Sequence, residues 1–213
     1  MNMIAIIDYN AGNLTSVKLS LSAIGAEGIV TSSPEIIRKA DHVIFPGVGA
    51  AASAMAHLKG LGLDTTIRET IASGTPFLGI CLGTQILFDS SEEDGGTEML
   101  GILPGTVKRF QPASSRDKVP HMGWNQVAYP RLHPAFEGIP EGSDFYFVHS
   151  YYPCPANDQD SICKTEFADT VFTSAVARGN IVATQFHIEK SGKAGLKVLF
   201  NFLKWDGKEP ASC

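Results

Sequence analysis

One stretch of the chain reads Pro76-Phe77-Leu78-Gly79-Ile80-Cys81-Leu82-Gly83-Thr84-Gln85. Residues 77–80 form a short apolar run, which predicts a buried strand. Cys81 follows at once, with one glycine two positions before it and another two positions after it. Residues 82–88 have the pattern of a helix start. A strand, a sharp turn and a helix around Gly-x-Cys-x-Gly are typical of a nucleophile elbow, with cysteine in place of serine.

The chemistry of a nucleophile explains the residue types at this turn. A strained turn leaves no room for the Cβ atoms of neighbouring residues, so glycines are expected beside it. The Cys81 thiol is also expected at a helix N-terminus, where the helix dipole favours the thiolate. The alternative is a buried cysteine between two packing glycines, because cysteine is among the residue types most often buried.

The chain before the elbow alternates between apolar segments and helical patterns. Each apolar segment is almost free of polar residues, as in a parallel sheet that is covered on both faces. The sequence therefore predicts an α/β fold of three layers, with a mostly parallel central sheet flanked by helices. The expected strands are residues 3–8, 27–30, 42–45 and 77–80, and the expected helices begin near residues 14, 34, 51 and 63.

The chain after the elbow changes character. Residues 90–98 are acidic and glycine-rich, which indicates an exposed segment. Residues 178–181, Arg-Gly-Asn-Ile, are typical of a hairpin turn between antiparallel strands. We expect strands at residues 105–110, 125–128, 145–151, 171–178 and 181–185, and a closing helix at 194–205. Since no repeat or linker is evident, we expect a single domain over residues 1–205 and a polar tail over 206–213.

Composition excludes several classes of function. The 213 residues carry a formal net charge of −5 and no basic run, which argues against nucleic acid as a partner. No apolar stretch reaches transmembrane length and the first residues lack the pattern of a secretion signal, so we expect no membrane association. Four cysteines in a chain of this length do not form a disulfide framework, and neither Cys-x-x-Cys nor His-Glu-x-x-His occurs. We therefore expect a cytoplasmic protein with no metal and no cofactor.

A cysteine nucleophile needs a base, and His187 is the strongest candidate. It follows an apolar strand, where the functional loops of parallel sheets gather. Glu189 lies two residues further on, and residues i and i+2 of an extended chain point the same way, so its carboxylate can orient the imidazole. The alternative is a surface histidine with no partner.

A glycine-rich loop follows the strand expected at residues 42–45. Gly47-x-Gly49-x-x-Ala52 imitates a dinucleotide-binding turn, but the acidic residue which that motif needs about twenty positions on would fall inside a helical pattern. The favoured interpretation is an oxyanion loop, whose exposed backbone N–H groups stabilise the charge of a tetrahedral intermediate.

These motifs together resemble the class I glutamine amidotransferase family. The resemblance rests on Gly79-Ile80-Cys81-Leu82-Gly83-x-Gln85 and on Gln185-Phe186-His187-x-Glu189. It implies the flavodoxin-like fold of that family and a glutaminase with the triad Cys81, His187 and Glu189. It also implies an oxyanion hole at Val48, Gly49 and Leu82, and a glutamine site formed by Gly49, Gln85, His149, Ser150 and Tyr151.

Further motifs are similar to one branch of the family, which supplies ammonia in histidine biosynthesis. They are residues 8–17, 45–49, 120–125 and 146–152, so that the resemblance spans nearly the whole chain. It implies that ammonia passes to a separate (β/α)₈-barrel cyclase subunit in a heterodimer, with Asn13, Trp124 and Lys190 at the interface. For Trp124 the alternative is an ordinary core aromatic.

The sequence departs from the family at one position, since Ile188 stands where the family usually has proline. Two rival functions remain at this point. One is an amidotransferase subunit of another pathway, such as anthranilate or GMP synthesis, against which the motifs around Asn13 and Trp124 argue. The other is a redox or stress protein of the same fold, which would need neither Gln85 nor the pair His187 and Glu189.

Overall fold

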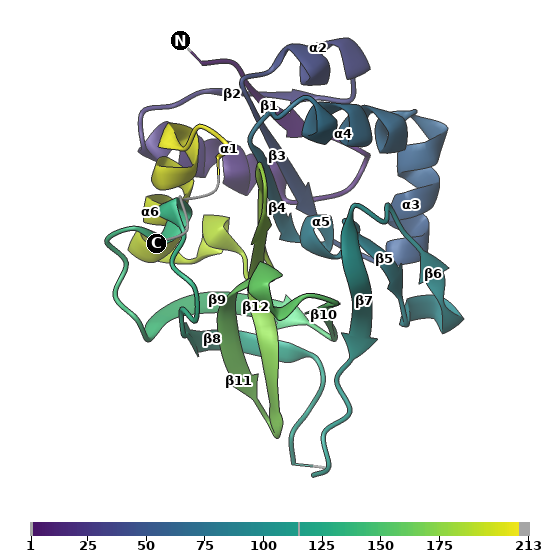
Figure 1. The fold of residues 1–213 in the computed structure, drawn as a ribbon, viewed down its shortest axis with the longest axis vertical. Helices are drawn as coiled ribbons and strands as arrows, with labels where there is room; N and C mark the ends of the chain where they lie inside the picture. Colours follow the sequence, from purple (N-terminus) through teal and green to yellow (C-terminus); the bar gives the residue numbers. More distant parts are fainter. Residues whose placement is uncertain (1, 115, 209–213) are drawn as a thin grey trace.

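A sheet of seven strands forms the centre of the molecule in the computed structural model, which describes residues 2–114 and 116–208 (Figure 1). Its strand order is β11-β12-β13-β4-β3-β1-β2. The pairs β1–β2, β1–β3, β3–β4 and β4–β13 are parallel, whereas β11–β12 and β12–β13 are antiparallel. The strands are β1 Ile4–Ile7, β2 Gly28–Thr31, β3 His42–Gly47, β4 Phe77–Cys81, β11 Ser161–Phe167, β12 Thr170–Arg178 and β13 Ile181–Thr184.

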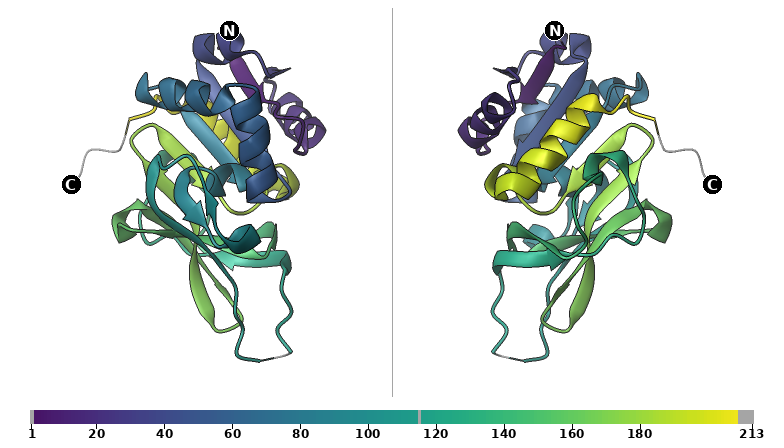
Figure 2. Two further views of the ribbon diagram at one scale, coloured as in Figure 1. Left: turned by 90° about the vertical axis from the view of Figure 1, so that its right-hand side faces the viewer. Right: turned by 90° about the vertical axis from the view of Figure 1, so that its left-hand side faces the viewer.

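Helices cover both faces of this sheet, as Figure 2 shows. Ile4 and Ile6 of β1 pack in one apolar cluster with α1 and α6, while Ala5 and Ile7 point to the opposite face and pack with α2, α3 and α4. This period-two alternation is what a strand buried on both faces requires. The helices are α1 Leu14–Ala23, α2 Pro34–Lys39, α3 Ala51–Gly60, α4 Leu63–Ala72, α5 Leu82–Gln85 and α6 Gly192–Lys204. The expectation of a three-layer, mostly parallel α/β fold is confirmed.

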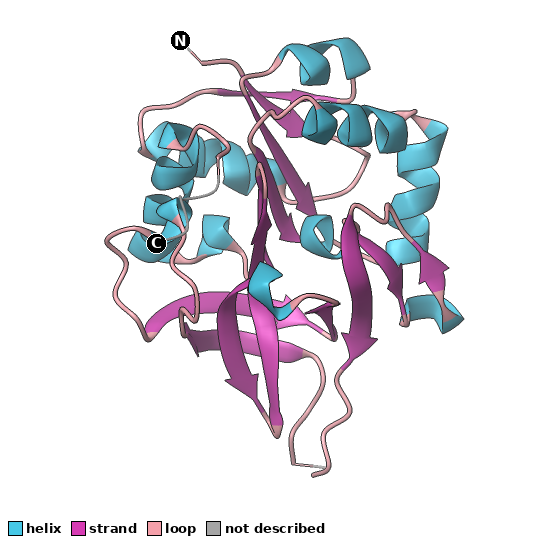
Figure 3. Ribbon diagram, in the orientation of Figure 1, coloured by secondary structure: helices cyan, strands magenta, loops and turns pink. Residues whose placement is uncertain are grey.

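A strand-rich region lies around the β11–β12 end of the main sheet, in the lower half of Figure 3. It contains a four-stranded sheet of order β10-β7-β5-β6 and the two-stranded pair β8–β9. The strands are β5 Phe88–Ser91, β6 Thr97–Glu98, β7 Leu103–Arg109, β8 His121–Val127, β9 Ser143–His149 and β10 Tyr151–Pro155. Four short 3₁₀ turns complete the described chain, namely η1 Glu93–Gly95, η2 Pro134–Phe136, η3 Asp158–Asp160 and η4 Ile188–Lys190.

The helix expected at residues 82–88 is wrong beyond its first turn. The carbonyl groups of Ile86, Leu87 and Phe88 accept hydrogen bonds from residues 100–103 instead of from the next helical turn. This tertiary pairing ends α5 at Gln85 and begins β5 at Phe88. The stretch at 90–98 is mostly exposed, as expected, and it also forms a strand pair, because Ser90 and Ser91 pair with Glu98 and Thr97.

Other boundaries differ where the chain changes sheets. The strand expected at 145–151 is two strands, because His149 pairs with His121 of β8 while Tyr151 pairs with Arg109 of β7. Strand β11 was not expected from the sequence. The hairpin turn at residues 178–181 is confirmed, since Arg178 pairs with Ile181. Of the expected polar tail, residues 209–213 lie outside the described residues.

Candidate active site

Cys81 lies at the carboxyl end of β4, at the edge of the sheet where β3 and β13 also end. Its backbone has φ +55° and ψ −111°, a strained combination for a residue other than glycine. The residue is 7% exposed. This conformation turns the chain sharply from β4 into α5 and is the geometry of a nucleophile elbow. A cysteine that is merely packed at a strand end would not need this strained backbone conformation.

The two glycines that flank Cys81 have a direct steric reason. A Cβ atom on Gly83 would collide with the carbonyl oxygen of Phe45 in β3. A Cβ atom on Gly79 would lie 3.0 Å from both the Ala183 Cβ and the Gly83 carbonyl oxygen. The elbow can therefore lie against β3 only with glycine at position 83, and a side chain at position 79 would crowd β13 and the elbow itself.

His187 and Glu189 form a buried pair. The His187 Nδ1 atom lies 2.8 Å from the Glu189 Oε1 atom, and both side chains are almost fully buried. Burial alone lowers the pKa of His187, but the neighbouring Cys81 and the hydrogen-bonded Glu189 outweigh it and raise that pKa to about 10. The Nε2 atom itself makes no hydrogen bond to the described residues, and His187 and Cys81 line one cavity. The alternative of an unpaired surface histidine is wrong.

The backbone that joins this pair is a 3₁₀ turn and not the extended chain expected from the sequence. His187 precedes η4, and the Lys190 N–H donates to the His187 carbonyl. The turn brings Glu189 back to the imidazole. Ile188 is the first residue of the turn, a position that proline also fits, and its side chain is buried in the apolar cluster beside α6.

The backbone N–H groups expected to form the oxyanion hole differ in whether they already have a hydrogen-bond acceptor. Leu82 begins α5, so its N–H is one of the groups that a helix leaves unpaired. The Val48 N–H donates to the buried Tyr9 hydroxyl at 3.2 Å, and the same hydroxyl lies 3.4 Å from the Val48 carbonyl oxygen. The Val48 N–H thus already has an acceptor, whereas Gly49, with φ +97°, lines the cavity beside Cys81.

A cavity of about 300 Å³ opens onto Cys81 and His187. It brings together all the residues expected for glutamine binding and two that were not expected, Glu93 and Val148. Glu93 begins η1, and its carboxylate accepts a hydrogen bond from the Ala51 N–H at 2.7 Å. Burial raises the pKa of Glu93. The remaining lining residues are Val48, Gly49, Leu82, Gln85, His149, Ser150, Tyr151 and Lys190.

The outer face of β8 and β9 carries the exposed Met122 and Trp124 beside the half-buried Tyr146 and Val148, and Val148 also lines this cavity. Met122 pairs with Val148 and Trp124 pairs with Tyr146 across the two strands. Trp124 is 57% exposed, so the alternative of a core aromatic is wrong. Its ring packs edge-on against Tyr146, and the Lys190 ammonium lies 5.7 Å from the Tyr146 ring centre. We call Met122, Trp124, Tyr146 and Val148 the β8–β9 patch.

The third residue expected at an interface, Asn13, does not belong to the patch. It caps α1, with its side-chain oxygen accepting from the Ser16 N–H at 3.4 Å. Helix α1 packs against η4, the turn that carries Glu189 and Lys190.

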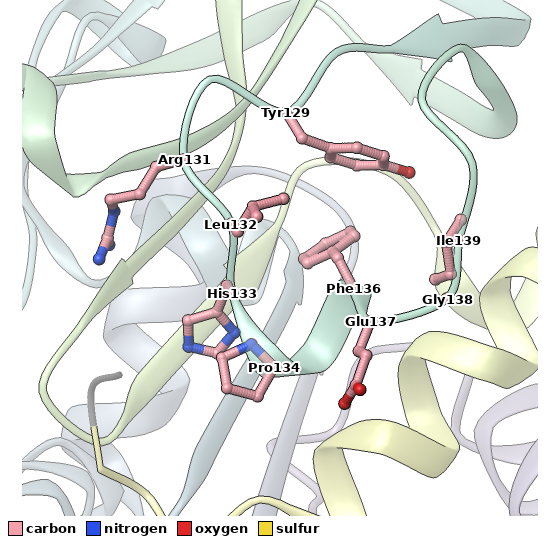
Figure 4. Close-up of a pocket in the computed structure, with 9 residues that line it drawn as sticks. All are labelled: Tyr129, Arg131, Leu132, His133, Pro134, Phe136, Glu137, Gly138 and Ile139. Atoms are coloured by element: carbon pink, nitrogen blue, oxygen red, sulfur yellow. The ribbon is translucent and has the colours of Figure 1, made fainter. Parts of the chain in front are cut away.

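A larger hollow of about 420 Å³ is lined by the segment that connects β8 to β9 (Figure 4). Tyr129 and Phe136 line it together with Leu132 and Ile139, and no cysteine does. Its size does not make it the better candidate, since it lacks a nucleophile. Among residues 2–114 and 116–208, no group of three or more His, Cys, Asp or Glu side chains is placed to hold a metal ion. No helix in the same ranges is long and apolar enough to span a bilayer.

Comparison with solved structures agrees with the fold. A crystal structure of a glutamine amidotransferase superposes with a TM-score of 0.73 at 16% identity, over 95% of this chain and 97% of that one. The structure of PurLQS from Thermotoga maritima gives a TM-score of 0.70 at 18% identity, over 96% of this chain and 99% of that one.

Comparison with curated sequences is more specific. The chain is 51% identical to "Imidazole glycerol phosphate synthase subunit HisH" of Dehalococcoides mccartyi, over 95% of this chain and 97% of the relative. It is 52% identical to the protein of the same description from Moorella thermoacetica, over 95% of this chain and 94% of the relative. The family model described as "Glutamine amidotransferase class-I" matches residues 5–205. With that match over nearly its whole length, the chain belongs to the class I glutamine amidotransferase family.

Proposed function

We propose that this chain is the glutaminase subunit of an imidazole glycerol phosphate synthase and that Cys81, His187 and Glu189 are its catalytic triad. The observation that carries the proposal is Cys81 on a strained elbow, sharing a cavity of about 300 Å³ with a His187 that Glu189 holds at 2.8 Å. Relatives that are about half identical to this chain are described as "Imidazole glycerol phosphate synthase subunit HisH".

The chemistry begins with transfer of the Cys81 thiol proton to His187 Nε2. The thiolate attacks the carboxamide carbon of glutamine, and the N–H groups of Leu82 and Gly49 stabilise the resulting oxyanion. When the intermediate collapses, the carbon–nitrogen bond breaks and His187 returns the proton to the departing ammonia. Water then hydrolyses the glutamyl thioester and releases glutamate. Glu189 fixes the His187 tautomer and stabilises the imidazolium throughout.

The cavity offers complementary groups for the rest of the substrate. The Glu93 carboxylate lines it and can bind the α-ammonium group of glutamine. Ser150 and Tyr151 lie at the turn where the chain passes from β9 to β10, so their backbone groups border the cavity. Gln85 also lines the cavity, and the carbonyl oxygen of its side chain can accept a hydrogen bond from the substrate.

The β8–β9 patch supports a partner at the mouth of this cavity. Val148 and Lys190 belong to the cavity wall and also lie in or beside the patch. An exposed apolar cluster with an aromatic centre is typical of a protein interface. We propose that a (β/α)₈-barrel cyclase subunit docks here in a cytoplasmic heterodimer. It would use ammonia to make imidazole glycerol phosphate and aminoimidazole carboxamide ribonucleotide.

The test is a steady-state glutaminase assay of the purified chain alone, with the cyclase subunit, and with the cyclase subunit and its nucleotide ligand. We expect low activity in the first arm and an increase of about a hundredfold or more in the last, as expected when partner binding completes an oxyanion hole. Absence of glutamine hydrolysis in all three arms would overturn the proposed function. Equal activity in all three would overturn only the activation by the partner.

A pair of surface variants tests the docking site. Trp124→Ala should weaken association with the cyclase subunit by about tenfold or more, because truncating a central aromatic anchor typically costs over 1 kcal/mol. Leu132→Ala is the matched control, since Leu132 is also an exposed apolar residue but lies at the hollow of Figure 4. Equal affinities for both variants, measured by calorimetry, would place the interface elsewhere.

A further inference from the structure

Gln185 is a fully buried amide that the mechanism above does not use. It directly follows β13, in which Thr184 pairs with Ile80 of β4. Cys81 directly follows Ile80, so the parallel register places Gln185 beside the nucleophile. The Gln185 Nε2 atom lies 3.6 Å from the Cys81 Sγ atom, within hydrogen-bond distance for sulfur.

The orientation of the Gln185 amide is fixed by its neighbours. The Gln85 Nε2 atom lies 3.0 Å from the Tyr151 carbonyl oxygen and 2.9 Å from the Gln185 Oε1 atom. A carbonyl oxygen only accepts, so Gln85 must present its NH₂ group to both atoms. Gln185 therefore accepts with Oε1 and turns its own NH₂ group toward sulfur.

His149 contacts the Tyr151 carbonyl that sets this orientation, and His121 in turn contacts His149. His149 Nδ1 lies 2.8 Å from the Tyr151 carbonyl oxygen and must donate to it. In a neutral ring His149 Nε2 then accepts from His121 Nδ1 at 3.2 Å, and His121 Nε2 accepts from the Asn125 amide at 3.2 Å. Since the Gln85 NH₂ group donates to the Gln185 Oε1 atom, the NH₂ end of the Gln185 amide is the one that faces Cys81.

We propose that Gln185 is a further catalytic residue, which donates a hydrogen bond to the Cys81 thiolate and stabilises it for attack. The proposal rests on the proposed glutaminase function. Gln185 gains and loses no proton in the reaction, because the thiol proton passes to His187. A hydrogen bond to a charged group is stronger than one to a neutral group, so the contact favours the thiolate over the thiol.

Two substitutions distinguish the hydrogen bond that Gln185 donates to Cys81 from the one that it accepts from Gln85. Gln185→Glu keeps an oxygen for the Gln85 NH₂ group but places a carboxylate against sulfur in place of the donor. We expect kcat to fall about ten- to a hundredfold with little change in KM, as expected for loss of a charge-assisted hydrogen bond. Gln185→Met removes both contacts, so we expect kcat to fall and KM to rise. The same two changes at the exposed Gln159 are the controls.

The decisive readout is the pH dependence of Cys81 alkylation by iodoacetamide, followed by peptide mass spectrometry without glutamine or partner. The other titratable groups around Cys81 are the same in every variant: His187, Glu189, Glu93, His149, Lys190 and Tyr9. We expect the alkylation midpoint to move upward by about one to two pH units in both Gln185 variants, equivalent to a ten- to hundredfold loss of thiolate. The Gln159 variants should keep the wild-type midpoint.

The outcomes distinguish this proposal from the proposed function. Unchanged midpoints in Gln185 variants that retain the wild-type circular dichroism spectrum would overturn the role of Gln185, even if the wild-type complex hydrolyses glutamine. If one variant fails to fold, the other decides. Shifted midpoints together with no glutaminase activity in the wild-type complex would keep the Gln185 contact and overturn the proposed function.

Discussion

Glu189 is the residue that most directly controls the state of His187. Its carboxylate lies 2.8 Å from the imidazole in a site almost closed to water. An imidazolium next to a buried carboxylate is stabilised, which contributes to the raised pKa of His187. The proton taken from Cys81 is therefore held on His187 until it passes to the departing ammonia.

Replacing Glu189 by glutamine tests this role. Glu189→Gln keeps the shape and an acceptor for Nδ1 but removes the charge, so turnover should fall about ten- to a thousandfold while glutamine binding is retained. Steady-state kinetics of the variant with its cyclase partner provide the measurement. Glu98→Gln, at an exposed position, is the control. Unchanged turnover would mean that another group orients His187.

At the residue scale, the sequence predicts those groups whose spacing along the chain reflects their contact. Gly79, Cys81 and Gly83 belong to one turn, and His187 and Glu189 to another. Glu93, Gln185 and Tyr9 reach the site because the fold brings distant parts of the chain together. Glu93 also lies in an acidic stretch typical of an exposed segment, and the pairing of β5 with β6 and the hydrogen bond from the Ala51 N–H hold it at the cavity.

The loop after β3 is the element that controls the oxyanion site. Tyr9, at the end of β1, is fully buried and its hydroxyl contacts both backbone groups of Val48. Burial raises the pKa of Tyr9 to about 12, so the hydroxyl keeps its proton at neutral pH. Because glycines on both sides of Val48 permit a peptide rotation, this contact selects one orientation of the loop.

Tyr9→Phe removes that contact and frees the Val48 N–H. We expect the glutaminase activity of the chain without partner to rise about two- to tenfold, as one neutral hydrogen bond is worth about 0.5–1.5 kcal/mol. The activity with partner should change less. Tyr129→Phe, at the hollow of Figure 4, is the control. A partner-free activity equal to that of the wild type would show that Tyr9 does not restrain the loop.

At the element scale, sequence patterns predict what local periodicity determines. The helix at Leu63–Ala72 and the hairpin at residues 178–181 have local signals and agree with the structure. Strand β11 and the one-turn helix α5 depend on partners distant in sequence, such as the N–H groups of residues 100–103 that end α5. No local pattern contains that information.

The molecule as a whole contains four buried histidines that resist protonation. Burial lowers the pKa of His42, and it lowers the pKa of His121 to about 4, His133 to about 4 and His149 to about 3. In the unfolded chain each titrates near about 6.5. Below that pH the unfolded state binds more protons than the folded state, so the free energy of unfolding falls as pH falls from about 6.5 toward 4. His187 does not oppose this loss, because its raised pKa gives its full stabilisation at any pH below about 6.5.

Urea unfolding at pH 7 and pH 5 measures this effect. Each such histidine contributes a slope of up to about 1.4 kcal/mol per pH unit in that range. His133→Asn should reduce the difference between the two pH values, since an asparagine oxygen can still accept from the Ala135 N–H. His57→Asn, at an exposed position, should not change it. Equal unfolding free energies of the wild type at both pH values would contradict the prediction.

The most direct test of the whole account is where an electrophilic glutamine analogue reacts. The chain, in complex with the cyclase subunit, is incubated with the analogue and its peptides are mapped by mass spectrometry. If Cys81 is the nucleophile of a glutaminase, it alone is labelled, and added glutamine protects it. Labelling of Cys154, Cys163 or Cys213 in place of Cys81, or glutamine turnover that persists in Cys81→Ser, would contradict the account.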